Sequence, residues 1–160
     1  MHPNVARVAG AARAAGLEIA VERFPDGTRT AADAARAVGC DVAQIVKSLV
    51  FMADGEPILA LVSGANRVDP GRLGSALGAA GAVRRADGDE ARQATGVAIG
   101  GVPPFGHVRP VTVLVDRDLL RHELLWAAAG LPDAVFAVTP ADLVRISGGR
   151  VVDLAAADGG

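Results

Sequence analysis

Apolar and β-branched residues occur along the chain in short runs, which polar turn residues separate. Two of these runs, residues 48–52 and 57–63, flank an Asp-Gly pair, and this pattern predicts two antiparallel strands joined by a hairpin. Residues 123–128 and 134–138 predict a second hairpin, although the alanine-rich stretch 124–129 could instead be helical. Further strands are predicted at residues 18–24, 97–99, 111–115 and 151–154.

Helix-start signals lie between the predicted strands. Thr30 and Asp33 have the spacing of a capping box, and Asp69 is followed by a proline that suits the first helical position. A short helix beginning at Asp41 is predicted to deliver Lys47 near its end. The remaining predicted helices are capped by Asn4, Asp87, Asp116 and Thr139. Hairpins and helices without regular β-α-β alternation indicate the α+β class, with a mixed, largely antiparallel sheet.

The composition limits the classes of protein to which the chain can belong. Its 160 residues predict one domain, residues 1–160, and its 51% hydrophobic content comes in runs too short to cross a bilayer. A formal net charge of −2 and few aromatic residues exclude a generally basic nucleic-acid binder and a base-stacking platform. The first residues lack a signal-peptide pattern, and the single Cys40 cannot form an internal disulfide. We therefore expect a cytoplasmic protein with no membrane or DNA partner.

Lys47 is the only lysine in the chain, beside fifteen arginines, and it lies within an apolar segment. An ammonium is a compact point charge and a guanidinium is a broad planar fork, so a site shaped for one does not readily accept the other. This contrast suggests a functional role for Lys47. The alternative is an amphipathic lysine whose stem covers apolar surface. Ser48 follows directly, but neighbours on a strand point to opposite faces, which argues against a Ser-Lys catalytic pair.

A loop rich in glycine and proline, residues 100–107, lies between two apolar runs. Its glycines permit backbone conformations that other residues avoid, and its prolines stiffen the chain, so successive N–H groups could converge on an anion or oxyanion. An ordinary surface connection is the alternative. His107 beside this loop is a candidate functional residue, although a loop-tethering role fits it better than catalysis. The sequence holds no H-E-x-x-H or C-x-x-C motif, and we expect no metal site.

Four segments together resemble the YbaK/EbsC family, which includes freestanding bacterial Cys-tRNA(Pro) deacylases and the editing domain of bacterial prolyl-tRNA synthetases. The most specific are residues 44–49, which contain the lysine, and 95–106, which contain the glycine loop; residues 62–69 and 140–143 support them. The resemblance implies a curved, barrel-like sheet surrounded by helices, and hydrolysis of the ester joining a wrong amino acid to tRNA. It also implies that the substrate's ribose hydroxyl helps to activate water, without a cofactor. The expected partners are the aminoacyl-tRNA 3′ end and a tRNA synthetase.

The resemblance also assigns roles to individual residues. Lys47, Gly100 and Gly101 are the expected catalytic residues: the lysine holds a phosphate or other polar groups of the substrate, and the glycines present N–H groups to the ester carbonyl. Pro104 is expected to fix the loop. The other expected substrate-binding residues are Phe24, Ser48, His107, Trp126, Gly130 and Val135. A local basic surface for tRNA could come from Arg67, Arg72, Arg84, Arg85 and Arg109.

Departures from the family pattern bear on specificity. The stretch 134–138 is wholly apolar where the Cys-tRNA(Pro) deacylases carry an aspartate, and the segment 126–130 lacks their serine. A tyrosine early in those enzymes corresponds to Phe24. We therefore expect an apolar pocket, lined by Phe24, Trp126 and Val135, for a small or medium amino acid other than cysteine. The alternative function is a non-catalytic module that binds an aminoacyl-adenosine-like ligand or a protein partner.

Overall fold

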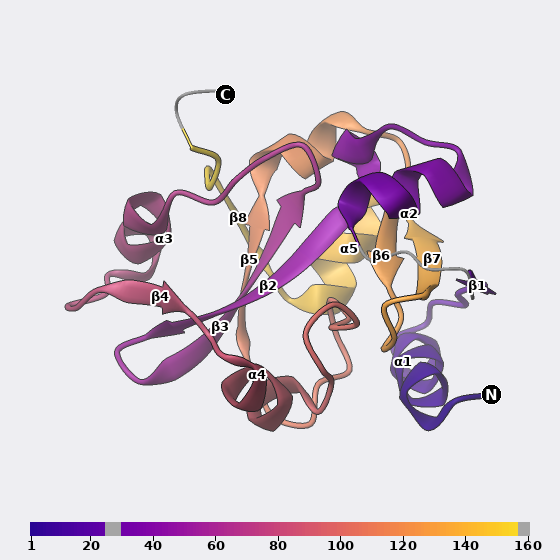
Figure 1. Cartoon of the computed structure of the whole chain (residues 1–160), viewed down its shortest axis with the longest axis horizontal. Coiled ribbons are helices and arrows are strands. Elements are labelled where there is room, and N and C mark those ends of the chain that lie inside the picture. The colour runs from indigo at the N-terminus through magenta and orange to yellow at the C-terminus, as the bar shows by residue number, and fades with distance from the viewer. Residues whose placement is uncertain (25–29, 157–160) are drawn as a thin grey trace.

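The computed structural model describes residues 1–24 and 30–156 (Figure 1). The turn expected at residues 25–27 lies outside the described residues. The helices are α1 (Pro3–Ala14), α2 (Ala31–Val38), α3 (Pro70–Leu77), α4 (Gly88–Thr95) and α5 (Pro140–Ser147), with short 3₁₀ helices η1 (Val42–Gln44) and η2 (Arg117–Arg121). The strands are β1 (Val21–Arg23), β2 (Val46–Ala53), β3 (Glu56–Ser63), β4 (Val83–Arg85), β5 (Thr112–Asp116), β6 (Leu125–Ala128), β7 (Ala134–Val138) and β8 (Arg150–Val152). The expected α+β class is confirmed.

The strands are divided between two sheets. One has the order β1-β7-β6, and the other has the order β4-β2-β3-β5-β8. The pairs β1–β7, β6–β7, β2–β3 and β2–β4 are antiparallel, whereas β3–β5 and β5–β8 are parallel. An isolated bridge between Ile45 and Trp126 links the start of β2 to the smaller sheet. The mixed, largely antiparallel arrangement is therefore confirmed, including both hairpins, while closure into a barrel stays a prediction.

Polar side chains cap most helices as the sequence predicts. The Thr30 hydroxyl accepts from the Asp33 N–H at 3.0 Å, and the Asp33 carboxylate accepts from the Thr30 N–H at 3.3 Å, which completes the capping box of α2. Helix α1 differs, because Pro3 takes its first position and His2 precedes it as the cap. The His2 Nδ1 accepts from the Asn4 N–H at 3.1 Å. The prediction that Asn4 itself caps this helix is therefore wrong.

The β2–β3 hairpin separates two apolar clusters, because successive side chains of a strand point to opposite faces. Val50 of β2 belongs to the cluster that α1 and α5 cover through Val8 and Leu143. Phe51 belongs to the opposite cluster, which α3 covers through Leu73. Figure 1 shows α3 beside the β4 end of the larger sheet and α1 beside the smaller sheet. Successive side chains of β2 therefore pack alternately against the cluster that α1 and α5 cover and the cluster that α3 covers.

Two local predictions are wrong, and one strand was missed. Lys47 is the second residue of β2 rather than the end of a helix, because η1 already stops at Gln44. Residues 97–99 form no strand, because the chain turns there and the Gly101 N–H donates to the Ala98 carbonyl at 3.1 Å. Strand β4 was not predicted at all: it is a three-residue edge strand with two exposed arginines and no apolar alternation.

Candidate active site

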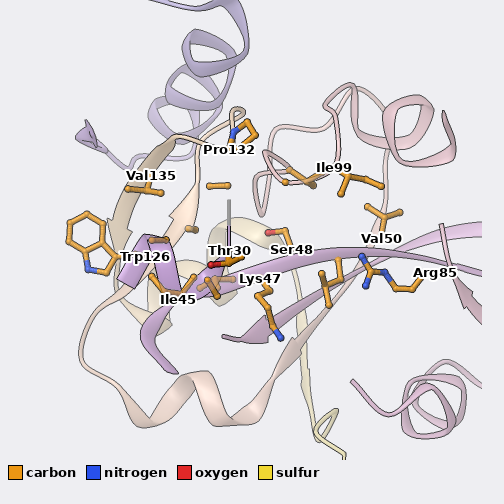
Figure 2. Close-up of a pocket in the computed structure, with 18 of the residues that line it drawn as sticks. Thr30, Ile45, Lys47, Ser48, Val50, Arg85, Ile99, Trp126, Pro132 and Val135 are labelled. Atoms are coloured by element: carbon orange, nitrogen blue, oxygen red, sulfur yellow. The ribbon is translucent and has the colours of Figure 1, made fainter. Parts of the chain in front are cut away.

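A cavity of about 290 Å³ lies between strand β2, the start of α2, the smaller sheet and the glycine loop. Figure 2 shows side chains from all of these elements arranged around it. Ala128 and Val135 face it from β6 and β7, where they form a cross-strand pair. Ala31 and Ala34 face it from α2, whose start the Thr30 cap fixes. The walls are therefore mainly apolar, and small residues keep the space open.

Lys47 and Ser48 are neighbours on β2, but their side chains lie on opposite faces of the sheet. Ser48 is on the same face as Val50, and Figure 2 shows its hydroxyl on the cavity side of the strand. The same view shows the Lys47 side chain directed away from Pro132 and Val135. The two residues therefore line one cavity through one strand without forming a Ser-Lys pair.

The Ser48 hydroxyl is shielded from solvent and has no hydrogen-bond partner among the described residues. The other hydroxyl on the cavity wall belongs to Thr30, and it is already engaged by the α2 cap. A hydroxyl that is hidden from water and left unpaired costs about 1–3 kcal/mol. Ser48 is therefore the wall residue whose side-chain oxygen is left without a hydrogen-bond partner among the described residues.

The Lys47 ammonium donates a hydrogen bond to the main-chain carbonyl of Asn66, in the loop that follows β3. Burial lowers the pKa of Lys47 below its ordinary value, and the guanidinium of Arg85 lowers it further. The Asp116 carboxylate opposes these effects and raises the Lys47 pKa, while Arg67 adds a smaller lowering. Two guanidinium groups and one carboxylate thus act on the ammonium.

The arginines expected to form a basic surface fall into two groups. Arg84 forms an ion pair with Glu90 at 2.7 Å, and Arg72 lies 4.0 Å from Asp69. None of the ion pairs found in residues 1–24 and 30–156 involves Arg67, Arg85 or Arg109. The Arg85 guanidinium instead stacks over the Phe51 ring, 5.5 Å from its centroid, on the same side of the sheet as Lys47.

The glycine loop reaches the cavity through Gly100, which has a positive φ of 98°. Its N–H has no hydrogen-bond partner within the described part of the chain. Gly101 lies behind it, packed so closely on Leu131 that a Cβ would stand 2.8 Å from the Leu131 Cα. The Gly101 N–H donates to the Ala98 carbonyl. The Gly101 carbonyl accepts from the Gly130 N–H at 3.0 Å. Only the Gly100 N–H of this pair is therefore available to a ligand.

His107 tethers the far end of the same loop. Its Nε2 lies 2.7 Å from the Pro103 carbonyl. Because a carbonyl can only accept, Nε2 carries the proton and donates. Burial lowers the pKa of His107, and the nearby Arg7 lowers it too, while the bond to Pro103 acts in the opposite direction. Pro104 is buried beside this tether and outside the cavity wall. Both residues therefore hold the loop rather than face the cavity.

The structure brings together half of the residues that the sequence singled out. The cavity wall contains Lys47, Ser48, Gly100, Trp126 and Val135. The residues outside that wall are Phe24, Gly101, Pro104, His107 and Gly130. Phe24 extends the pairing of β1 instead, because its N–H donates to the Asp133 carbonyl at 2.8 Å. The cavity wall therefore includes Trp126 and Val135 but not Phe24.

Several wall residues were missed by sequence reasoning. Ala31, Ala34, Ile99 and Pro132 line the cavity, and none carries a chemical group that marks it as functional. The capping box could have located the first two, because it fixes where α2 begins. The other two depend on how distant loops meet, and no local signal reveals that.

The cavity wall, as described, contains no histidine, cysteine, aspartate or glutamate. Groups of three or more such residues, as a metal ion would need, are likewise absent from the described ranges. Among the helices of those ranges, none is long and apolar enough to cross a membrane. Within the described ranges, a reaction in this cavity therefore has no carboxylate, imidazole or thiol of the wall to use.

The chain resembles several known proteins in sequence. It is 29% identical over 132 residues to the uncharacterized protein YwhH of Bacillus subtilis (strain 168), covering 82% of this chain and 83% of that protein. It is 33% identical over 142 residues to the proline–tRNA ligase of Xanthomonas oryzae pv. oryzae (strain MAFF 311018). That match covers 88% of this chain and 23% of the ligase, so the chain spans about a quarter of the ligase.

The structure adds a closer likeness. A solved structure provisionally assigned as a trans-editing enzyme for prolyl tRNA synthetase is 44% identical to this chain, with a TM-score of 0.92. The match covers 98% of this chain and 99% of that one. The model of the aminoacyl-tRNA editing domain family matches residues 25–146, which is more than half of the sequence. The chain therefore belongs to the aminoacyl-tRNA editing domain family.

Proposed function

We propose that this protein is a trans-editing hydrolase that cleaves the ester bond of mischarged aminoacyl-tRNA, acting in the cytoplasm on errors of prolyl-tRNA synthetase. The observation that carries the proposal is an apolar cavity that Gly100 lines with an N–H unpaired in the described part of the chain, in a protein of the editing-domain family. The similarity to a proline–tRNA ligase and to a trans-editing enzyme supports tRNA(Pro), the tRNA that accepts proline, as the tRNA concerned. The synthetase itself is then a second partner.

The cavity suits a small or medium apolar amino acid. Its walls carry alanines at positions 31, 34, 127 and 128, and the polar groups that would favour cysteine are absent from positions 134–138. Discrimination between amino acids that differ by one methylene reaches only about 1–3 kcal/mol, so a synthetase for a small amino acid benefits from a second sieve. Alanine is one amino acid that suits these walls, because its side chain is small and has no polar atom to bury.

The chemistry follows from what the cavity offers. A water oxygen attacks the ester carbonyl carbon, the bond from that carbon to the ribose oxygen breaks, and the ribose oxygen recovers a proton. The Gly100 N–H donates to the developing oxyanion, and one preorganised donor of this kind contributes on the order of 10²–10³ in rate. The neighbouring ribose hydroxyl of the substrate orients the water, because the described wall has no carboxylate or imidazole. Gly101 and Pro104 support Gly100 from behind.

Lys47 has a different role in this proposal. Its side chain is directed away from the Pro132 and Val135 side of the cavity, so it binds a phosphate near the tRNA 3′ end rather than the ester. Arg85 and Arg67 add positive charge on that side. Ser48, on the cavity face, pairs its free hydroxyl with the α-amino group of the substrate.

A deacylation screen tests the proposal. Samples of tRNA(Pro) mischarged with alanine, serine or cysteine, or correctly charged with proline, are incubated with wild-type protein and with Lys47→Ala. Ester loss is followed over time. We expect selective hydrolysis of the alanyl ester, strongly reduced in the variant. A folded wild-type protein that binds these tRNAs but hydrolyses none of them would instead support a non-catalytic binding module.

A further inference from the structure

Asp116, the last residue of β5, is a buried carboxylate that the proposed chemistry does not use; the residue is only 1% exposed. Its Oδ1 accepts from the Asp118 N–H at 3.1 Å and caps η2. Its Oδ2 accepts from the Ser63 N–H at 3.2 Å and from the Asn66 side chain at 2.8 Å. A buried charge is tolerated when hydrogen bonds replace its water. Capping of η2 accounts for the hydrogen bond to Oδ1 but not for the two hydrogen bonds to Oδ2.

The second oxygen leads to Lys47 through Asn66. The Asn66 amide donates to Asp116 and to Asp118, both at 2.8 Å, so two carboxylates fix this side chain. The main-chain carbonyl of the same residue accepts the hydrogen bond from the Lys47 ammonium. Ser63 ties the other end, because its hydroxyl donates to the Ala43 carbonyl at 2.7 Å, just before β2. The loop after β3 and the start of β2 are thus held together.

We propose that Asp116 is a positioning residue for Lys47: by fixing Asn66, it places the carbonyl that orients the lysine ammonium on the anion-binding side of the sheet. The proposal rests on the proposed function for its effect on turnover. The placement itself does not, because it can be measured without tRNA. The Asp116 carboxylate also attracts the ammonium directly, as its raising effect on the Lys47 pKa indicates.

The single lysine makes the test unambiguous. Protein labelled with ¹⁵N-lysine contains one side-chain ammonium, and its protons exchange with water too fast to be seen unless a hydrogen bond retains them. We expect a visible ammonium cross-peak for the wild type at mildly acidic pH and low temperature. Asp116→Asn and Asn66→Ala should each lose it. Asp153→Asn should keep it, because Asp153 is exposed and pairs with Arg117 at 3.0 Å, outside the network.

Two results would overturn the placement: no wild-type cross-peak, or an unshifted cross-peak in the folded variants. Circular dichroism verifies folding, and if Asp116→Asn does not fold, Asn66→Ala decides alone, because Asn66 is only partly buried.

A double-mutant cycle, measured by deacylase turnover, tests the functional consequence. Asp116→Asn should lower kcat/KM about tenfold in the wild-type background but less than about twofold in a Lys47→Met background, because linked residues are not additive. Equal losses in both backgrounds would show that Asp116 acts only through the stability of the fold and would overturn the link to Lys47. A wild-type protein without deacylase activity would refute the proposed function and leave the ammonium result to decide the placement.

Discussion

The two faces of strand β2 differ sharply around two adjacent residues. On one face, the Ser48 hydroxyl has no partner, and the cavity around it is mainly apolar. On the other face, the Lys47 ammonium is bonded to Asn66 and lies near Arg85. Strand alternation alone produces this separation. One short strand thus has an unpaired hydroxyl of the cavity wall on one face and a hydrogen-bonded lysine ammonium on the other.

The two faces of β2 are therefore expected to recognise different parts of the substrate. An apolar cavity can measure the size of an amino acid, but it gains little from the charge of tRNA. A cationic face attracts any phosphate backbone and carries no information about the amino acid. Changes on the cavity face should therefore affect substrate choice and turnover, and changes on the lysine face should affect tRNA affinity.

The largest effect is expected from filling the cavity. Ala128→Phe places a ring opposite Val135, where the cavity is lined by small residues. We expect kcat/KM for the edited substrate to fall on the order of 10²-fold, because misplacing the ester by about 1 Å costs that much. Binding of uncharged tRNA should not change. Ala14→Phe is the control, since Ala14 is exposed at the end of α1 and lies outside the cavity wall. Normal turnover by Ala128→Phe would contradict the assignment of the cavity.

The next effect is expected on the opposite face. Lys47→Met should raise KM about tenfold with little change in kcat, since a hydrogen bond to a charged group is worth about 1.5–3 kcal/mol. The slope of log affinity against log salt should become shallower by about 0.7, which corresponds to one lost phosphate contact on a single strand. Arg13→Met on α1 should change neither quantity, because Arg13 pairs with Glu18 away from the site. A fall in kcat at constant KM would place Lys47 in the chemical step instead.

A smaller effect distinguishes two serines that lie near one another on β2 and β3. Ser48→Ala removes an unpaired hydroxyl, so the free energy of unfolding should stay constant or rise by up to about 1 kcal/mol. Ser63→Ala breaks the bond to the Ala43 carbonyl and should lower it by about 1 kcal/mol. Urea denaturation followed by circular dichroism measures both. A clear loss of stability in Ser48→Ala would mean that its hydroxyl is paired after all.

Much of the local structure could be predicted from the sequence, because local signals determine it. The Asp-Gly pair between two apolar runs fixes the β2–β3 hairpin, and the Thr30 capping box fixes the start of α2. Both signals depend on residues within a few positions of one another. The opposite orientation of Lys47 and Ser48 could be predicted for the same reason, once both were placed on a strand.

The rest of the site could not be predicted, because it depends on contacts between distant segments. The parallel pairing of β3 with β5 joins residues that are more than fifty positions apart. Gly101 looked like an N–H donor for the ester, yet the turn back to Ala98 uses that group. Phe24 looked like a pocket residue, yet it continues a ladder with Asp133. The composition of a loop therefore indicates which groups are available but not which remain free after folding.

The smallest effect concerns the charge on the lysine face. Arg85 lowers the pKa of Lys47, so Arg85→Ala should raise that pKa toward its ordinary value, which a ¹³C or ¹⁵N titration of the single lysine measures directly. Arg84→Ala should leave it unchanged, because Arg84 is the strand neighbour on the other side and pairs with Glu90. Only the ammonium form attracts phosphate, so tRNA affinity should fall as the pH rises through the Lys47 pKa. Arg85→Ala should move that fall to higher pH, and equal shifts in the two variants would show that the two faces are not electrically separate.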